Sequence, residues 1–433
     1  MASDWEGLSI GYSDTMFDVS PTWTRIDTAV RTSGIQIERG RQDEFERTDT
    51  GSMTVTINDR AKVIDIAALD AKPIAFALRN PISDEWFPLF RGVVDEVKSE
   101  YDKSTLVNRI TITAVDALDY FAGVQMIVGT SGFVNGTANK QGFIFYEDTL
   151  GTVDDRIRAL LEDANWPALL SSIFTGNVSV RETRYSPGDT ILSAILDACD
   201  AEFPTVANFY IDRRGLAQFH GRFARFDPDL VSACASNWEF NRWKAGDNDA
   251  ARAESDRAKM VPPFSVVRSR SMVRNHALAY PQDLDRIDLD TFVVEDAGSI
   301  SSLGMRSWSA ENLIILAGTT TGNTAKQEAK LYSNYIVDNY SSLRNRVPQC
   351  TVMSQRPVGE WGPAVWDALC GWELSDALDV DIESAGDQVD EEYYIEGLHY
   401  DISPMGGDLD THYPKVVMTA DLTPTAYWTT SPF

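Results

Sequence analysis

Hydrophobic and polar residues alternate with a period of two along much of the first 125 positions. Residues 34–40 and 51–58 show this alternation most clearly, and residues 74–79 and 110–115 continue it. A period of two places successive side chains on opposite faces of an extended chain, as in a strand with one buried face. Short alternating segments separated by polar turns favour a β-barrel or a β-sandwich, and we predict an N-terminal β-barrel module over residues 1–125.

The hydrophobic period changes to the helical value after residue 125. Hydrophobic residues recur at helical spacing over residues 152–164 and 190–202. The second of these segments follows Ser186, which precedes a proline and which we expect to be the helix N-cap. Residues 209–221 are typical of a hairpin that turns at an Arg-Arg-Gly sequence. We therefore predict an α+β middle domain over residues 126–244.

A stretch of small and charged residues separates the middle domain from the last third of the chain. Residues 245–262 have this composition and lead into consecutive prolines, so we predict a linker there. Alternating segments resume after it, beginning with an expected strand over residues 265–273. A capping-box pattern opened by Thr324 predicts a long helix over about residues 324–344. We predict a second β-barrel module over residues 263–433 that includes this helix.

Two hairpin sequences at opposite ends of the chain resemble each other. The first contains Gly92 and closes at Asp116, and the second contains Gly397 and closes at Asp421. The glycine and the closing aspartate are 24 residues apart in both copies. Internal similarity of this kind indicates that a structural unit is repeated within the chain. It predicts a mainly β protein with an α+β insert: two tandem, similar β-barrel modules separated by a mixed α/β domain.

Length and charge limit the classes of protein to which the chain can belong. Its 433 residues predict two to four domains. The net charge of −27 argues against a protein that wraps nucleic acid, but is compatible with a conduit through which nucleic acid passes. Residues 357–414 contain fifteen Asp and Glu and neither Lys nor Arg. This acidic stretch is either a solvated face or a wall that faces a lumen or a basic partner.

The sequence contains neither a membrane-spanning segment nor a secretory signal that we can recognise. Its four cysteines, Cys199, Cys234, Cys350 and Cys370, lie far apart and show no metal-ligand spacing. We expect free, mostly buried thiols in a protein made in a reducing cytoplasm.

Known catalytic signatures are absent from the sequence, so we expect no enzyme activity, no catalytic residues, no cofactor and no metal site. His399, Asp401 and His412 are conceivable metal ligands, but surface or turn histidines explain them better because no further ligand is indicated. The acidic pairs at residues 147–148 and 154–155 could act as glycosidase carboxylates. For the second pair, an acidic helix N-terminus is the simpler explanation.

Tryptophans cluster near the predicted second module. Trp361, Trp366 and Trp372 lie close together in sequence, and Trp238 and Trp243 flank the linker. Exposed aromatic side chains could form a sugar-binding platform. Burial in a core or at a subunit contact is the more common role of such residues, and we favour it here.

The order of these segments resembles the minor tail proteins of long-tailed, siphophage-type bacteriophages, in particular the baseplate-hub or tail-associated type found in phages of actinobacteria. The resemblance covers nearly the whole chain and depends on order more than on any one motif. It is carried by residues 34–41, 51–60, 89–95, 111–116, 210–215 and 394–406.

The resemblance implies a fold, an assembly and a set of partners. Hub proteins of this type have two similar β-barrels and form homotrimers, and their six barrels match the sixfold tail tube and the ring of distal tail protein. The implied further partners are the tape-measure protein, downstream tail-tip or fibre proteins, and DNA as passing cargo. The implied location is the virion tail tip, after synthesis in the bacterial host cytoplasm. Because the chain ends directly after its second module, we expect neither a fibre nor a hydrolase domain.

Two other functions stay open at this stage. The first is a distal tail protein or other tail adaptor that assembles as a hexamer, although distal tail proteins usually contain one barrel with an appended module. A carbohydrate-binding or cell-wall-degrading tail-tip protein would use the tryptophans or the acidic pairs described above.

Overall fold

The structure is a computed structural model. It describes residues 7–26, 31–59, 64–102, 107–126, 137–138, 144–147, 151–222, 224, 242–246, 265–282, 290–319, 322–354, 362–384, 387–403 and 414–424.

A twelve-stranded sheet, antiparallel except for one pairing, dominates the fold. Its first part, called here the first strand unit, has the neighbour order β2-β1-β5-β6-β7-β4-β3. The strands of this unit are β1 (Leu8–Tyr12), β2 (Thr24–Arg25), β3 (Arg31–Gly40), β4 (Asp49–Asp59), β5 (Pro73–Arg79), β6 (Trp86–Asp102) and β7 (Val107–Val115).

The remaining strands of the sheet form the second strand unit. In it, β15 pairs with β21, β21 with β22, β22 with β23 and β23 with β20. Its members are β15 (Arg242–Gly246), β20 (Gln349–Met353), β21 (Ala377–Ser384), β22 (Asp387–Ser403) and β23 (Lys415–Pro424). A helix, α9 (Gly362–Gly371), separates β20 from β21 in the chain.

The predicted alternation is confirmed in the strands of the first unit. In β4, Met53, Val55 and Ile57 are buried, while the residues between them are half-exposed. These side chains belong to one hydrophobic core that both strand units share. The protein is therefore mainly β, as predicted.

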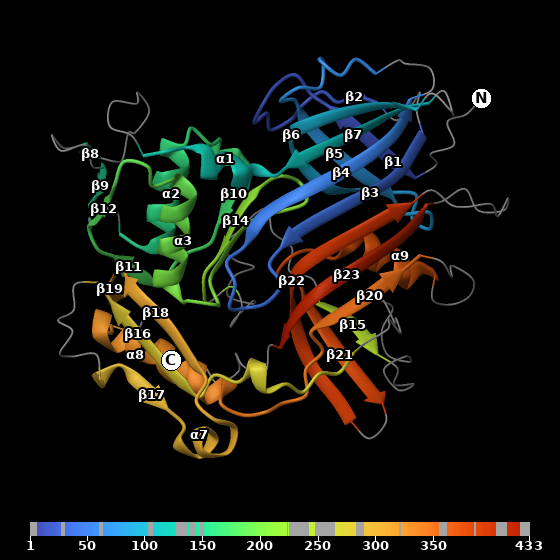
Figure 1. Cartoon of the computed structure of the whole chain (residues 1–433). Helices are drawn as coiled ribbons and strands as arrows, with labels where there is room; N and C mark the ends of the chain where they lie inside the picture. The colour runs from blue at the N-terminus through green and yellow to red at the C-terminus, as the bar shows by residue number, and fades with distance from the viewer. Residues whose placement is uncertain are drawn as a thin grey trace.

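The middle of the chain forms small sheets and helices around a separate core. Figure 1 shows these elements beside the large sheet. They are α1 (Ala117–Gly123), β8 (Thr137–Ala138), β9 (Ile144–Tyr146), α2 (Val153–Asp163), η2 (Ala168–Leu170), β10 (Ser171–Ile173), β11 (Val178–Val180), β12 (Thr183–Tyr185), α3 (Ile191–Glu202), β13 (Asn208–Ile211) and β14 (Ala217–His220).

A further group of elements packs on the same middle core. It consists of η3 (Arg270–Met272), β16 (His276–Pro281), β17 (Val293–Glu295), α7 (Ala297–Leu303), β18 (Ser307–Leu313), β19 (Ile315–Gly318) and α8 (Ala325–Tyr340). Buried residues of α8 and β16 share the core with α2 and α3. Segments from both sides of residue 263 thus form one core, and the domain boundaries given above stay a prediction.

A buried arginine links α3 to α8. The Arg222 guanidinium lies 3.3 Å from a carboxylate oxygen of Glu202 and 3.0 Å from one of Glu328, and all three side chains are fully buried. The hydroxyl group of Tyr332 accepts a further hydrogen bond from Arg222. Because a buried charge is costly without partners, this network constrains how the long helix docks.

Three local predictions need correction or stay outside the described residues. The strand expected over residues 265–273 is a single bridge, Val267 to Arg346, followed by η3. The long helix begins after Thr324 with the predicted capping box but ends at Tyr340 rather than near residue 344. Most of the predicted linker lies outside the described residues, and its first two residues belong to β15.

The first turn of α3 also differs from the prediction, because Thr190 rather than Ser186 is its N-cap. The backbone just before the helix is extended and pairs with the chain after α1: Met126 N–H donates to Asp189 O, and Ile191 N–H donates to Val124 O. Thr190, which lies between the two paired positions, is extended with φ −109° and ψ 159°, so the helix starts four residues later than the sequence pattern indicates.

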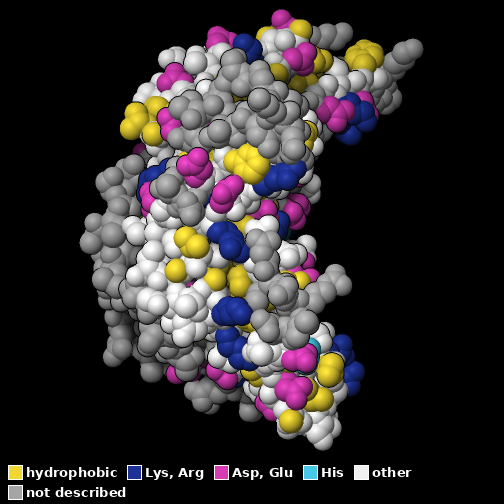
Figure 2. Space-filling view, turned by 90° about the vertical axis from the view of Figure 1, so that its left-hand side faces the viewer, with side chains coloured by type: hydrophobic (Ala, Val, Ile, Leu, Met, Phe, Trp, Pro, Cys, Tyr) yellow, Lys and Arg dark blue, Asp and Glu magenta, His cyan; other side chains and the backbone are white. Residues whose placement is uncertain are grey.

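The molecule is curved, and Figure 2 shows its outline hollowed on one side. On the face in that view, acidic and basic side chains lie intermixed with single hydrophobic ones.

Candidate functional site

The two strand units contain the same four-strand arrangement. The neighbour order is β4-β7-β6-β5 in the first unit and β20-β23-β22-β21 in the second, with the strands taken in the same chain order. The third strand of each set, β6 or β22, is 17 residues long. In both, its first half pairs with the preceding strand and its second half with the following strand.

The two hairpins predicted to be equivalent also share their register. Gly397 lies opposite Asp421 in the β22–β23 pair. In the β6–β7 pair, Val93 lies opposite Val115, which brings Gly92 next to Asp116 at the end of the ladder. The sequence match between these hairpins therefore corresponds to matching positions in the two strand units.

The closing aspartates make different contacts. The Asp116 carboxylate accepts hydrogen bonds from the N–H groups of Leu118 and Gly51, both at 2.9 Å. This carboxylate caps α1. Burial raises the pKa of Asp116 to about 7, although the two hydrogen bonds act to lower it. The Asp421 carboxylate instead lies 2.6 Å from both Gln349 Nε2 and His399 Nε2.

The two units meet where β3 pairs with β22. Figure 1 shows this contact as the blue β3 lying beside the red β22. The pairing is antiparallel and runs from Gly40 opposite Gly397 to Ile35 opposite Ile402. One continuous sheet therefore crosses from the beginning of the chain to its end, and we take this junction as the candidate functional site.

Two glycines allow the backbones to approach closely at the junction. Gly40 has a φ of +92°, and a Cβ atom there would lie 2.2 Å from Glu396 O and 2.9 Å from Gly397 Cα. A Cβ atom on Gly397 would lie 2.7 Å from Arg41 O. These distances are well below van der Waals contact, so the junction requires both glycines.

A buried ion pair fixes the same point. Arg41 Nε lies 2.9 Å from Glu396 Oε2, and the side chains are 3% and 0% exposed. The Arg41 guanidinium also donates to Thr205 O at 2.9 Å and to Glu46 O at 3.1 Å. Arg41 therefore connects the first unit, the second unit and the middle core.

A second buried pair lies beside the first. Arg39 Nη1 is 2.7 Å from Glu373 Oε1, and Arg213 N–H donates to the other oxygen of Glu373 at 3.1 Å. Burial alone would raise the pKa of Glu373, but the positive charges of Arg39 and Arg213 outweigh it and hold this pKa below its ordinary value. The junction is thus held by charged hydrogen bonds as well as by the ladder.

The acidic stretch of the sequence places carboxylates on one face of the β21–β22 hairpin. Asp379 lies opposite Glu392, and Asp390, two residues before Glu392 on the same strand, is exposed. Val380, the neighbour of Asp379 in β21, is buried in the core. On the other edge of β21, Lys244 of β15 lies opposite Asp379.

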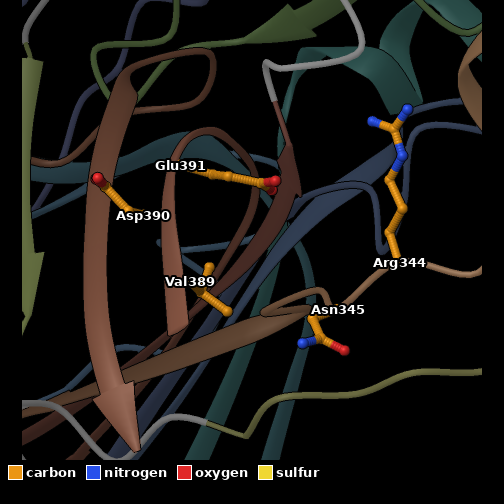
Figure 3. Close-up of a pocket in the computed structure, with 5 residues that line it drawn as sticks. All are labelled: Arg344, Asn345, Val389, Asp390 and Glu391. Atoms are coloured by element: carbon orange, nitrogen blue, oxygen red, sulfur yellow. The ribbon is translucent and has the colours of Figure 1, made fainter. Parts of the chain in front are cut away.

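A pocket of about 470 Å³ opens beside this hairpin. Arg344, Asn345, Val389, Asp390 and Glu391 line it, and Figure 3 shows Asp390 and Glu391 pointing to different sides of β22. Burial raises the pKa of Glu391, and the charge of Arg344 opposes this shift. The five lining residues include neither a nucleophile nor a set of metal ligands, so the pocket indicates no particular chemistry.

Of the metal-ligand candidates, His399 is placed at the junction. It lies opposite Glu38 of β3 and contacts Asp421, whereas Asp401 is exposed and His412 lies outside the described residues. In the part of the chain that the structure describes, no three His, Cys, Asp or Glu side chains form a possible metal cluster.

Stability should depend on pH through His399. The hydrogen bond to Asp421 raises the pKa of His399 above its ordinary value of 6.5. A raised pKa in the folded state means that the contact stabilises the protein fully below about pH 6.5. This contribution disappears as the pH rises through the folded-state pKa.

Chemical denaturation of the wild type and of His399→Gln at several pH values measures this contribution. The difference in free energy of unfolding between the two should be largest at acidic pH and should shrink above neutrality. A difference that does not change with pH would contradict the assignment.

The remaining candidates occupy structural positions. Trp366 and Trp372 are buried in the shared core, while Trp361 and Trp238 lie outside the described residues. The side chain of Trp243 lies outside them as well.

The acidic pair at residues 154–155 belongs to the first turn of α2, where Asp155 completes a capping box. Of the pair at residues 147–148, Glu147 is exposed and Asp148 lies outside the described residues. Cys199, Cys350 and Cys370 are free and buried, and Cys234 lies outside the described residues.

The two hairpins are recognisable in the sequence, but the residues that join the two strand units are not. The sequence does show a glycine next to a charged residue on each side of the junction. These pairs are Gly40 with Arg41, and Glu396 with Gly397. No described helix is long and apolar enough to span a membrane.

Comparison with solved structures identifies proteins of similar fold. The tail protein from Neisseria meningitidis MC58 matches with a TM-score of 0.53 and 10% identity over 98% of both chains. The E. coli c3393 protein is described as a component of the type VI secretion system with structural similarity to the T4 bacteriophage tail proteins gp27 and gp5. It matches with a TM-score of 0.42 and 8% identity, over 96% of this chain and 76% of that chain.

The Francisella PdpA–VgrG complex in its lidded form matches with a TM-score of 0.47 and 10% identity, over 96% of this chain and 52% of that one. No family model and no curated protein sequence matches the chain. The match to the Neisseria tail protein shows that the two chains share an overall fold.

Proposed function

We propose that this protein is a structural component of a phage tail: a homotrimeric hub at the tail tip. In this role it joins the sixfold tail tube and distal tail ring to a threefold tip, and lines the channel for the tape-measure protein and DNA. Its other partners are downstream tail-tip or fibre proteins, and its location is the virion. The siphophage type and the actinobacterial host are parts of the same proposal, as is the absence of enzyme activity.

The observation that carries the proposal is the repeated four-strand arrangement. We treat the two strand units as tandem barrel modules, so that three chains supply six similar modules. A trimer that presents six similar modules can make a similar contact with each of the six subunits of a sixfold ring. The shared fold with a tail protein supports the same class of function.

The charge pattern supports a role as a conduit. The net charge is −27, and the β21–β22 hairpin carries opposed carboxylates on one face. A negative wall repels phosphate groups, so DNA passes without adhering to it. We propose that this acidic face is part of the channel lining.

Native mass spectrometry of the purified chain tests the assembly. We expect three copies in the complex. Six copies would favour the distal tail or adaptor alternative, and a chain that stays monomeric at all concentrations would contradict the hub.

The alternative of a carbohydrate-binding or cell-wall-degrading protein is less well supported, because Trp366 and Trp372 are buried rather than exposed. A glycan array and a peptidoglycan-release assay distinguish this alternative. We expect no binding and no release. Binding or release that is saturable and abolished by unfolding would favour a tip protein acting on the cell wall.

A further inference from the structure

The long strand of each unit has an edge that the preceding strand covers only in part. On β22 the remaining edge is occupied by β3, from Gly397 to Ile402. On β6 the preceding strand, β5, reaches Val93. Beyond that point no described strand pairs with this edge of β6, which is the equivalent of the edge that β3 occupies on β22.

The uncovered part of β6 is accessible and charged. Glu96, Lys98 and Glu100 are exposed, and Tyr101 is 48% exposed. Lys98 and Glu100 form an exposed ion pair at 2.6 Å. A sheet edge of this kind presents backbone N–H and C=O groups that can pair with a strand of another chain, and its charges limit which strand can do so.

The second unit has a complementary open edge at β20. In the first unit the equivalent strand, β4, carries β3 on this edge. Among the described strands β20 pairs only with β23, and a single bridge from Val267 to Arg346 lies just before it. Arg268 and Arg270 are exposed beside that bridge. This edge is therefore basic where the β6 edge is mainly acidic.

We propose that residues 96–102 of β6 bind a second copy of this chain, on the face formed by β20 and residues 265–270. The contact between chains then repeats the contact that β3 makes with β22 within one chain. Figure 1 shows β6 and β20 in different parts of the sheet, so one chain offers both surfaces at once. A head-to-tail contact closes into a ring when the rotation between neighbouring copies is a third of a turn, as the hub function requires. The inference rests on the proposed hub function and specifies how its copies meet.

Charge reversal on β6 tests the contact. We expect Glu96→Lys combined with Glu100→Lys to raise the dissociation constant of the oligomer by roughly tenfold or more, because two attractive pairs become repulsive. Native mass spectrometry over a dilution series measures it. The matched control is Asp401→Lys, an exposed position on β22 whose edge β3 already covers. This control should leave the oligomer unchanged.

Reversal of the basic partner should restore assembly. Arg268→Glu with Arg270→Glu should weaken the oligomer alone and restore it when combined with the two β6 reversals in one chain. Hydrogen exchange provides a readout that needs no variant. Backbone amides of residues 96–102 should exchange more slowly in the oligomer than in the monomer.

The outcomes separate this inference from the proposed function. The edge contact is overturned if the trimer survives the β6 reversals and the amides of residues 96–102 exchange equally in trimer and monomer. The hub function would be unaffected by that result. A wild-type chain that is not a trimer overturns the hub, and one that stays monomeric overturns both.

Discussion

Replacement of Arg41 by methionine should lower the free energy of unfolding by about 3–5 kcal/mol, because it removes one half of a buried ion pair and keeps the charge of the other half, Glu396, in the interior. Both side chains are almost fully buried, and Arg41 makes backbone contacts to Thr205 and Glu46 in addition to the ion pair. Denaturant unfolding, followed by tryptophan fluorescence, measures the change.

A nearby exposed arginine serves as the matched control. Arg47 pairs with Asp200 at 2.5 Å, but its side chain is 50% exposed, so Arg47→Met should cost less than about 1 kcal/mol. The double variant Arg41→Met with Glu396→Gln should recover part of the loss, because the buried negative charge of Glu396 is removed as well. A loss for Arg41→Met no larger than that of the control would contradict the importance of the buried pair.

Replacement of Gly40 by alanine should have an effect at least as large, about 4 kcal/mol or more, and should separate β3 from β22. The added Cβ atom would lie 2.2 Å from Glu396 O, and the φ of +92° is unfavourable for any residue with a side chain. Backbone atoms cannot move away without breaking the ladder between the units. Thermal unfolding and the exchange of β22 amides measure the two effects.

The same strand offers a control. Gly34 also lies in β3 beside β22, but a Cβ atom there would meet only Ile402 O, at 3.9 Å. Gly34→Ala should therefore be close to neutral. An equal loss in the free energy of unfolding for the two variants would contradict the claim that close backbone approach at Gly40 is required for the pairing of β3 with β22.

Local features of this fold could be predicted from the sequence because they depend on neighbouring residues. The alternation in β4 and the capping box at Thr324 are both found where the pattern indicates them. The Gly–Asp spacing of the two hairpins corresponds to a shared register. The start of α3 was misplaced, because pairing of Asp189 with Met126 overrides the local helix signal.

The junction could not be predicted in the same way. β3 and β22 are separated by most of the chain, and nothing in either strand's alternation specifies the other as its neighbour. The pairing depends on the fit of Gly40 against Glu396 and on one buried charge pair, which are properties of the folded backbone. Likewise, α8 joins the middle core through Glu328 and Tyr332, a contact that its own hydrophobic spacing does not reveal.

Electron cryomicroscopy of the assembled oligomer tests whether the two strand units occupy equivalent places in one ring. We expect three chains around a threefold axis, with first and second units alternating at six similar positions and Gly92 and Gly397 at matching places. A ring in which the two units lie at different radii, or in which only one unit surrounds the axis, would contradict this expectation.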